Sequence, residues 1–229
     1  MDKEQIKIAI IDYQMGNLFS IKRACEHVGL IPVVTSAKSV VREANGIILP
    51  GVGAFGDAMD NLRRLDLIEP IKDFIGSSRP FMGICLGLQL LMSESEEFGS
   101  HDGLDIIRGS VVRFPNAGRE GHKKKVPQVG WNRIYPHERT MPRYWEWSPL
   151  KDIETNTYMY FVHSYYAIPE ESGVILSCTD YEGTEYASSF FRNNVFACQF
   201  HPEKSGYEGL RIYSTWAKML GDKRKMAYE

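Results

Sequence analysis

Short apolar runs alternate with amphipathic segments along the first 95 residues of the chain. Four of these runs have the continuously apolar, often β-branched character of strands buried on both faces, and they lie at 6–12, 31–36, 46–51 and 80–85. The segments between them carry apolar residues at helical spacing and predict helices at 17–29, 57–76 and 86–95. Pro70 is expected to break the second helix. Strands that alternate with helices predict a parallel sheet with helices on both faces.

The pattern changes from about Gly109 onward, where strand-like runs follow one another with few helices between them. These runs lie at 110–114, 159–167, 173–179, 186–191 and 195–200, and a final helix is predicted at 207–220. We therefore expect an α/β fold: a mostly parallel central sheet flanked by helices, with an antiparallel extension in the C-terminal half, in a single domain over residues 1–229. Within the less regular stretch 116–157, Trp145 and Trp147 alternate like strand residues and form either an exposed patch or an insertion packed on the sheet.

Composition and charge narrow the function classes. The 229-residue chain has 27 Lys and Arg against 29 Asp and Glu, and this net charge of −2 gives no electrostatic reason to expect nucleic acid or a membrane surface as a partner. No apolar run approaches the roughly 18 residues of a membrane span, and the charged N-terminus is unlike a secretory signal. The four cysteines lack zinc-ligand spacing, so we expect a cytoplasmic protein with reduced thiols and no metal.

Cys85 stands between two glycines in the run FMGICLGLQL, residues 81–90. One interpretation is a small buried thiol in a core strand, since cysteine is among the most buried residue types. The other is a nucleophile on a strand–turn–helix elbow. There, crowding requires neighbours with almost no side chain, and the helix N-terminus directs N–H groups at developing negative charge. The stretch alone does not separate the two interpretations.

A cysteine nucleophile needs a base, and the base needs a group that orients it. His201 follows the last apolar run, and Pro202 favours an extended backbone at this histidine. Residues i and i+2 of an extended segment face the same side, so the Glu203 carboxylate can reach the imidazole. Because both strand ends would lie at the carboxyl edge of a parallel sheet, we expect a Cys/His/Glu constellation there. The alternative is a surface His beside a surface Glu, and the presence of Cys85 argues against it.

The glycines of LPGVGAFGDAM, residues 49–59, spell GxGxxG between a strand and a helix, which would suit a dinucleotide site. The motif, however, follows the third strand, Pro50 stiffens its approach, and no acidic residue ends a next strand about 20 residues on. We therefore favour a loop that lends backbone N–H groups to an oxyanion, as acyl transfer to a cysteine requires, and expect no cofactor.

GICLGLQ and HPEKSG together resemble the class I (triad) glutamine amidotransferases. IDYQMGNL, PGVGAFGDAM, VPQVGWN and YFVHSYYA narrow the resemblance, over residues 6–218, to the glutaminase subunits of imidazole glycerol phosphate synthases. The resemblance implies hydrolysis of L-glutamine to glutamate and ammonia. It also implies a heterodimer with a (β/α)8-barrel cyclase subunit. The cyclase receives the ammonia through a tunnel and forms imidazole glycerol phosphate and aminoimidazole carboxamide ribotide in histidine biosynthesis.

The resemblance also assigns roles to residues. Cys85 would attack the carboxamide and form a glutamyl thioester, His201 would move the proton, and Glu203 would orient the imidazole. The backbone N–H of Leu86 and the loop Gly51, Val52 and Gly53 would hold the oxyanion, and we expect this loop to rest in a non-productive orientation until the cyclase is bound and liganded. Matching substrate contacts are Gln89, His163, Ser164 and Tyr165. Matching positions at the cyclase interface are Asp12, Asn17, Trp131, Tyr160 and Lys204.

Some alternatives stay open. His163 suits a packed strand-end histidine at least as well as a substrate contact, and Tyr13 and Met15 could simply pack locally. Gln128 stands where the family more usually has a His, the lysine run 123–125 favours a solvated loop over an interface, and 137–157 is longer than the resemblance implies. The chain could instead be a glutaminase for anthranilate, aminodeoxychorismate or lipopolysaccharide-sugar synthesis, a catalytically silent module, or a dinucleotide enzyme. The intact triad argues against the silent module.

Overall fold

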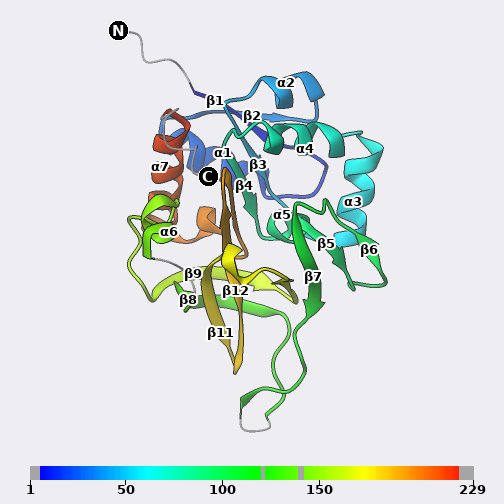
Figure 1. The fold of residues 1–229 in the computed structure, drawn as a ribbon, viewed down its shortest axis with the longest axis vertical. Helices are drawn as coiled ribbons and strands as arrows, with labels where there is room; N and C mark the ends of the chain where they lie inside the picture. Colours follow the sequence, from blue (N-terminus) through cyan, green and yellow to red (C-terminus); the bar gives the residue numbers. More distant parts are fainter. Residues whose placement is uncertain (1–5, 120–121, 139–141, 222–229) are drawn as a thin grey trace.

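A nine-stranded sheet runs through the centre of the molecule in the order β2-β1-β3-β4-β13-β12-β11-β8-β9 (Figure 1). The computed structural model describes residues 6–119, 122–138 and 142–221. The first five strands are parallel: β2 Ile31–Thr35, β1 Lys7–Ile11, β3 Gly46–Leu49, β4 Phe81–Ile84 and β13 Val195–Cys198. The other four are antiparallel to their neighbours: β12 Thr184–Arg192, β11 Ile175–Tyr181, β8 Gln128–Pro136 and β9 Thr157–His163. This sheet confirms the predicted fold class.

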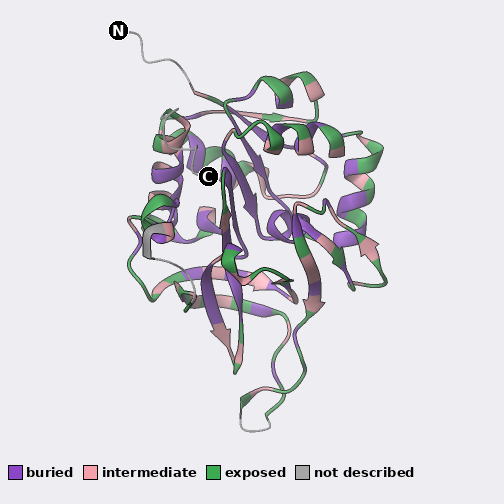
Figure 2. Cartoon of the chain, viewed as in Figure 1, coloured by how far each residue is buried: buried purple, intermediate pink, exposed green. Residues whose placement is uncertain are grey.

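Helices cover both faces of the parallel strands (Figure 1). They are α1 Leu18–His27, α2 Lys38–Glu43, α3 Phe55–Arg64, α4 Ile68–Gly76 and α7 Gly206–Gly221. The side chains of β1 alternate between two cores: Ile8 and Ile10 pack with residues of α1 and α7, whereas Ala9 and Ile11 pack with residues of α3 and α4. Burial on both faces is why this strand is continuously apolar, and Figure 2 shows the central strands buried.

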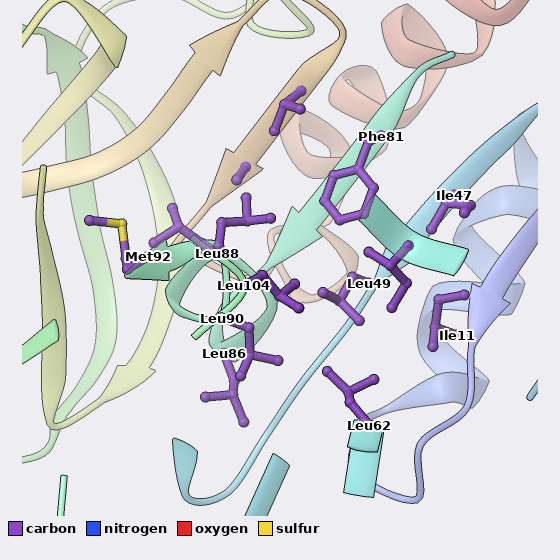
Figure 3. Close-up of a cluster of buried hydrophobic side chains, with 14 of the residues drawn as sticks. Ile11, Ile47, Leu49, Leu62, Phe81, Leu86, Leu88, Leu90, Met92 and Leu104 are labelled. Carbon is purple, nitrogen blue, oxygen red and sulfur yellow. The ribbon is translucent and has the colours of Figure 1, made fainter. Parts of the chain in front are cut away.

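The core under α3 and α4 extends to the short helix that follows β4 (Figure 3). That helix, α5 Leu86–Gln89, packs Leu86 and Leu88 into the same cluster as Leu49 of β3 and Leu62 of α3. Each buried leucine side chain stabilises the fold by about 1.5–3 kcal/mol. These contacts therefore fix the start of α5 at the carboxyl edge of β4.

A second sheet of four strands, in the order β10-β7-β5-β6, is a feature that the sequence pattern does not predict. Its strands are β10 Tyr165–Pro169, β7 Ile107–Arg113, β5 Met92–Ser95 and β6 His101–Asp102. The expected helix at 86–95 is therefore wrong beyond Gln89, because 93–97 offers no apolar stripe and Met92 pairs with Ile107. The run 159–167, expected as one strand, divides at Ser164 between β9 and β10.

Two further local predictions are wrong. The break in the helical stretch falls at 65–67, where Asp66 has a φ of 55°, and not at Pro70. Pro70 lies in the first turn of α4, where its missing N–H costs no helical bond. Trp145 and Trp147 lie on a helix, α6 Pro142–Trp147, and Trp145 is buried with its indole N–H donated to the carbonyl of Ile153 at 3.0 Å. Trp145 is thus packed on the core, whereas Trp147 is 39% exposed.

Two short 3₁₀ helices, η2 Ser172–Val174 and η3 Pro202–Lys204, complete the described elements. Of the helices in the described ranges, none is long and apolar enough to cross a membrane.

Candidate active site

Cys85 occupies a strained turn between β4 and α5. Its φ of 55° lies in the left-handed region that non-glycine residues rarely adopt, and its ψ is −108°. Its N–H donates to the carbonyl of Cys198 at 2.7 Å, and its own carbonyl accepts the N–H of Leu88 at 3.0 Å. Strained backbone held by such bonds is typical of a nucleophile elbow. Cys85 is buried, as the alternative interpretation expects, but it lies one residue beyond β4 and not within a core strand.

The glycines on either side of Cys85 are required by close packing. A Cβ on Gly83 would lie 2.8 Å from the carbonyl oxygen of Gly87, and a Cβ on Gly87 would overlap the carbonyl oxygen of Leu49. Neither neighbour is a flexible side chain that could yield. The elbow therefore needs both glycines, as the sequence predicts.

His201 and Glu203 approach the elbow from the neighbouring strand. β13 pairs with β4 in parallel, with Cys198 opposite Ile84, so both strand ends reach the same sheet edge. His201 has an extended backbone, with φ −103° and ψ 94°, and its Nδ1 lies 2.8 Å from Oε1 of Glu203. Both side chains are almost fully buried. Glu203 belongs to η3, so a tight turn brings it to the imidazole where an extended segment was expected.

The free edge of the imidazole is next to the thiol. Because Nδ1 bonds to a carboxylate, Nε2 is the nitrogen left to exchange a proton, and no hydrogen-bond partner for it occurs among the described residues. Burial alone would lower the pKa of His201. The charge of Cys85, together with the hydrogen bond and charge of Glu203, outweighs burial and raises this pKa to about 10. The raised pKa means that His201 holds a proton at neutral pH.

The sulfur of Cys85 has two further polar neighbours. It lies 3.9 Å from the carbonyl oxygen of Val162, to which the thiol can donate, and 3.7 Å from Nε2 of Gln199. The oxygen of the Gln199 amide accepts from Nε2 of Gln89 at 3.0 Å, and the same Nε2 donates to the carbonyl of Tyr165 at 2.8 Å. The Gln89 amide nitrogen is thus committed inside the protein. Only its oxygen end is left for a ligand.

A cavity of about 400 Å³ opens onto Cys85. It is bounded by Leu86 and Gln89, by Val52 and Gly53 of the loop, by 162–165, and by Glu97 and Lys204. The predicted nucleophile, oxyanion and substrate residues therefore meet at one site, apart from Gly51, the buried first glycine of the loop, which does not line the cavity. A larger cavity, about 650 Å³, lies between α1 and α7 but does not include Cys85. Since the Glu203 side chain is fully buried, that cavity does not expose its carboxylate.

The ring of His163 is packed inside the protein at the end of β9. Nδ1 lies 2.8 Å from the carbonyl of Tyr165 and Nε2 lies 3.2 Å from the hydroxyl of Tyr186, so both nitrogens are occupied. Burial, with the charge of His201 acting in the same direction, lowers the pKa of His163 to about 4. The ring is neutral at physiological pH. Any contact of 163–165 with a ligand must therefore come from other atoms of this segment.

Two side chains hold the ends of the glycine loop. The hydroxyl of Tyr13 donates to the carbonyl of Pro50 at 2.6 Å, and a Cβ on Gly51 would overlap this hydroxyl. At the other end, the N–H of Phe55 donates to Oε2 of Glu97 at 2.7 Å. Tyr13 thus does more than pack locally. Sequence reasoning missed Glu97, whose distance from the loop along the chain left no local signal.

The predicted interface residues fall into two groups. Trp131 is 55% exposed and packs edge-on against Tyr160, with ring centroids 6.0 Å apart, and the Lys204 ammonium lies 5.8 Å over the same tyrosine ring. These three lie together beside the cavity. Asp12 accepts the N–H of Gln14 and Asn17 caps α1, so both have local structural bonds in the β1–α1 loop.

The lysine run 123–125 is only partly a solvated loop. Lys123 and Lys125 are exposed, whereas Lys124 is buried, bonds to the hydroxyl of Thr184 and lies 5.5 Å over the ring of Phe114. Burial lowers its pKa. The solvated interpretation is wrong for this one lysine because its ammonium has an aromatic and hydroxyl environment.

Comparison with known proteins agrees with this geometry. Residues 9–214 match the family "Glutamine amidotransferase class-I". The imidazole glycerol phosphate synthase subunit HisH of Syntrophotalea carbinolica is 48% identical over 93% of this chain and 100% of its own, and that of Geobacter metallireducens is 46% identical over 92% and 97%. A chain of the PurLQS structure from Thermotoga maritima superposes with a TM-score of 0.69 at 17% identity, covering 95% of this chain and all of its own, and supports the fold. The chain therefore belongs to the class I glutamine amidotransferase family.

Proposed function

We propose that this chain is a glutaminase subunit that releases ammonia from L-glutamine for an imidazole glycerol phosphate synthase. The observation that carries the chemistry is the strained Cys85 elbow beside the buried His201–Glu203 pair. The observation that favours the pathway is identity of 42–48% to HisH subunits over nine-tenths of the chain or more. We also propose that the protein is located in the cytoplasm.

In the first half of the reaction, the Cys85 thiolate attacks the carboxamide carbon of glutamine. The oxyanion of the tetrahedral intermediate is held by the N–H of Leu86 and by an N–H of the Gly51–Val52–Gly53 loop. His201 then gives its Nε2 proton to the departing nitrogen, the C–N bond breaks, and ammonia leaves a glutamyl thioester on the sulfur. Glu203 keeps the imidazole in the required tautomer and stabilises its positive charge.

In the second half, His201 takes a proton from water and the resulting hydroxide attacks the thioester carbonyl. The C–S bond breaks, glutamate leaves, and the thiolate–imidazolium pair is restored. The amino-acid end of glutamine carries an ammonium, and among the described residues that line the cavity Glu97 is the carboxylate. We assign Glu97 and the oxygen of Gln89 to this ammonium, with Ser164 and Tyr165 beside them.

The proposed partner is a (β/α)8-barrel cyclase that docks where the cavity opens. Trp131, Tyr160 and Lys204 support this placement, because an exposed aromatic and cationic group borders the catalytic cavity. The outward face of β8 and β9 also carries Val129, 57% exposed, opposite Val162, which borders the cavity. Asp12 and Asn17 are included in the proposed interface on the resemblance alone.

The experiment that tests the proposal mixes the purified chain with candidate acceptor synthases and measures glutamate release. We expect a cyclase of histidine biosynthesis to stimulate release strongly, and other synthases to leave it at the basal level. If an anthranilate or sugar-amination synthase stimulates it instead, the pathway assignment is overturned while the glutaminase assignment remains. If the isolated chain releases glutamate as fast as the complex does, the expectation that the oxyanion loop rests in a non-productive orientation is overturned.

A further inference from the structure

Gln199 is a buried polar residue to which the triad chemistry gives no role. It lies two residues before His201, and its side chain is fully buried. Its amide nitrogen is 3.7 Å from Sγ of Cys85. We propose that Gln199 is a further catalytic residue, which donates a hydrogen bond to the Cys85 sulfur and stabilises the thiolate. The inference rests on the proposed function in so far as Cys85 is the nucleophile.

The orientation of the Gln199 amide is fixed by a chain of bonds that ends at the backbone. The carbonyl of Tyr165 can only accept, so Gln89 must present its NH2 group there. The second hydrogen of that NH2 group is donated to the oxygen of Gln199 at 3.0 Å. Gln199 must therefore turn its own NH2 group to the sulfur. Gln89 decides which end of Gln199 faces Cys85.

This bond discriminates between the chemical states of the sulfur. In the thiol, the S–H can donate to the carbonyl of Val162, and the neutral sulfur is a weak acceptor. When the proton moves to His201, the sulfur carries a full charge and the Gln199 N–H becomes a charge-assisted donor, which is about twice as strong. In the thioester the sulfur is neutral again. Gln199 therefore favours the ionised free enzyme and the thiolate as leaving group.

Stabilising a thiolate also makes it a slightly poorer nucleophile. On a logarithmic scale, this loss of nucleophilicity is only about half of the gain in the fraction of thiol that is ionised. The net effect at neutral pH is faster reaction. Well above the ordinary cysteine pKa of about 8.5, a thiol is ionised without such a donor, and only the small loss of nucleophilicity remains. Removing the Gln199 donor should therefore slow the reaction of Cys85 at neutral pH and leave it unchanged or slightly faster at alkaline pH. A purely structural role of Gln199 would not change the sign of the effect with pH.

The test is alkylation of Cys85 by iodoacetamide over a range of pH, followed on the Cys85 peptide by mass spectrometry, with Cys85→Ser as background. Gln199→Met keeps the length of the side chain and removes the donor. We expect alkylation at neutral pH to slow about tenfold and to return at alkaline pH to the rate of the unchanged chain or above it. Gln199→Glu keeps the acceptor for Gln89 and should slow the neutral reaction further, because it places a negative charge beside the sulfur.

The matched control is Gln128→Met, which removes another buried glutamine whose amide lies 2.9 Å from the Tyr186 hydroxyl. Its alkylation profile should stay within about twofold of the unchanged chain. A Gln199→Met protein with an unchanged neutral rate, or with the same loss at every pH, would overturn the assignment. Alkylation needs neither glutamine nor cyclase. A shifted profile in a protein that releases no glutamate would therefore refute the proposed function and leave the Gln199–sulfur bond standing.

Discussion

The hydroxyl of Tyr13 and the carbonyl of Pro50 are joined by a hydrogen bond of 2.6 Å between the β1–α1 loop and the start of the glycine loop. Pro50 precedes the residues proposed to hold the oxyanion, and Glu97 holds Phe55 at the other end. Between these two anchors, Gly53 has a φ of 108° and Val52 is 39% exposed. Reorientation of the loop is therefore confined to the peptides between Pro50 and Phe55.

Replacing Tyr13 by Phe should reduce kcat for glutamine hydrolysis in the cyclase complex by about tenfold, with KM for glutamine changed less than about twofold. The ring packing is kept, but the buried carbonyl of Pro50 loses its donor, at a cost of about 1–3 kcal/mol, and the loop is no longer aligned. Steady-state glutamate release measures both constants. Tyr181→Phe removes a tyrosine bond of similar length but at an exposed site, to the carbonyl of Lys125 at 2.7 Å, and should leave kcat unchanged. Equal kcat values for the two variants would refute the role of Tyr13.

Replacing Glu203 by Gln should lower kcat by about 10²–10⁴-fold without unfolding the protein. The amide keeps the shape of the carboxylate but removes the charge and the ionic hydrogen bond that help to raise the pKa of His201. Glutamate release by the complex provides the measurement. Glu208→Gln removes a carboxylate from a half-exposed ion pair with Arg211 at 2.9 Å and serves as the control, with no expected change. An unimpaired Glu203→Gln enzyme would exclude an orienting role.

His163 makes the fold sensitive to acid. Its pKa is about 4 in the folded protein and 6.5 as the ordinary value, so the unfolded chain takes up the proton first as pH falls. Stability from the neutral ring is complete above about pH 6.5 and is lost as pH falls towards 4, by about 3 kcal/mol. Urea unfolding at several pH values, compared with His163→Gln, should show the advantage of histidine shrinking over this window. If the unfolding free energies of the two proteins change in parallel with pH, His163 is not held neutral.

Alanine at Gly87 should destabilise the protein by about 3 kcal/mol or more, because its Cβ would overlap the carbonyl oxygen of Leu49 and push α5 off the sheet edge. Gly76, at the end of α4, is the matched control, because a Cβ there would meet no atom of the described residues within 4 Å. Gly76→Ala should be neutral or stabilising by up to about 1 kcal/mol. Urea denaturation of the two variants separates a steric requirement from a general intolerance of alanine.

Local rules were sufficient to predict the Cys85 elbow and the contact between His201 and Glu203. The elbow at Cys85 follows from a strand, two glycines and a helix in immediate succession, and His201 and Glu203 are two residues apart. Parallel pairing of β4 and β13 then brings these segments together, as alternating elements suggest. The residues missed by sequence reasoning act across long separations: Glu97 meets Phe55 and Gln199 meets Cys85 only through the tertiary fold.

The second sheet was missed for a related reason. β5 begins inside an apolar run that fits helix and strand equally well, and its partner β7 lies beyond a turn and the short strand β6. Likewise, nothing in the run 159–167 marks Ser164 as the point where the chain passes from one sheet to the other. Such transitions depend on which surfaces pack together, and this information is spread over the whole chain.

In the proposed mechanism, Cys85 carries the glutamyl group. Acid quenching of the cyclase complex during turnover of glutamine, followed by mass spectrometry of the Cys85 peptide, tests it most directly. We expect a glutamyl adduct on Cys85, and we expect Cys85→Ala to abolish both the adduct and glutamate release. Glutamate release by the Cys85→Ala complex at the rate of the unchanged protein, or an adduct on another residue, would contradict it.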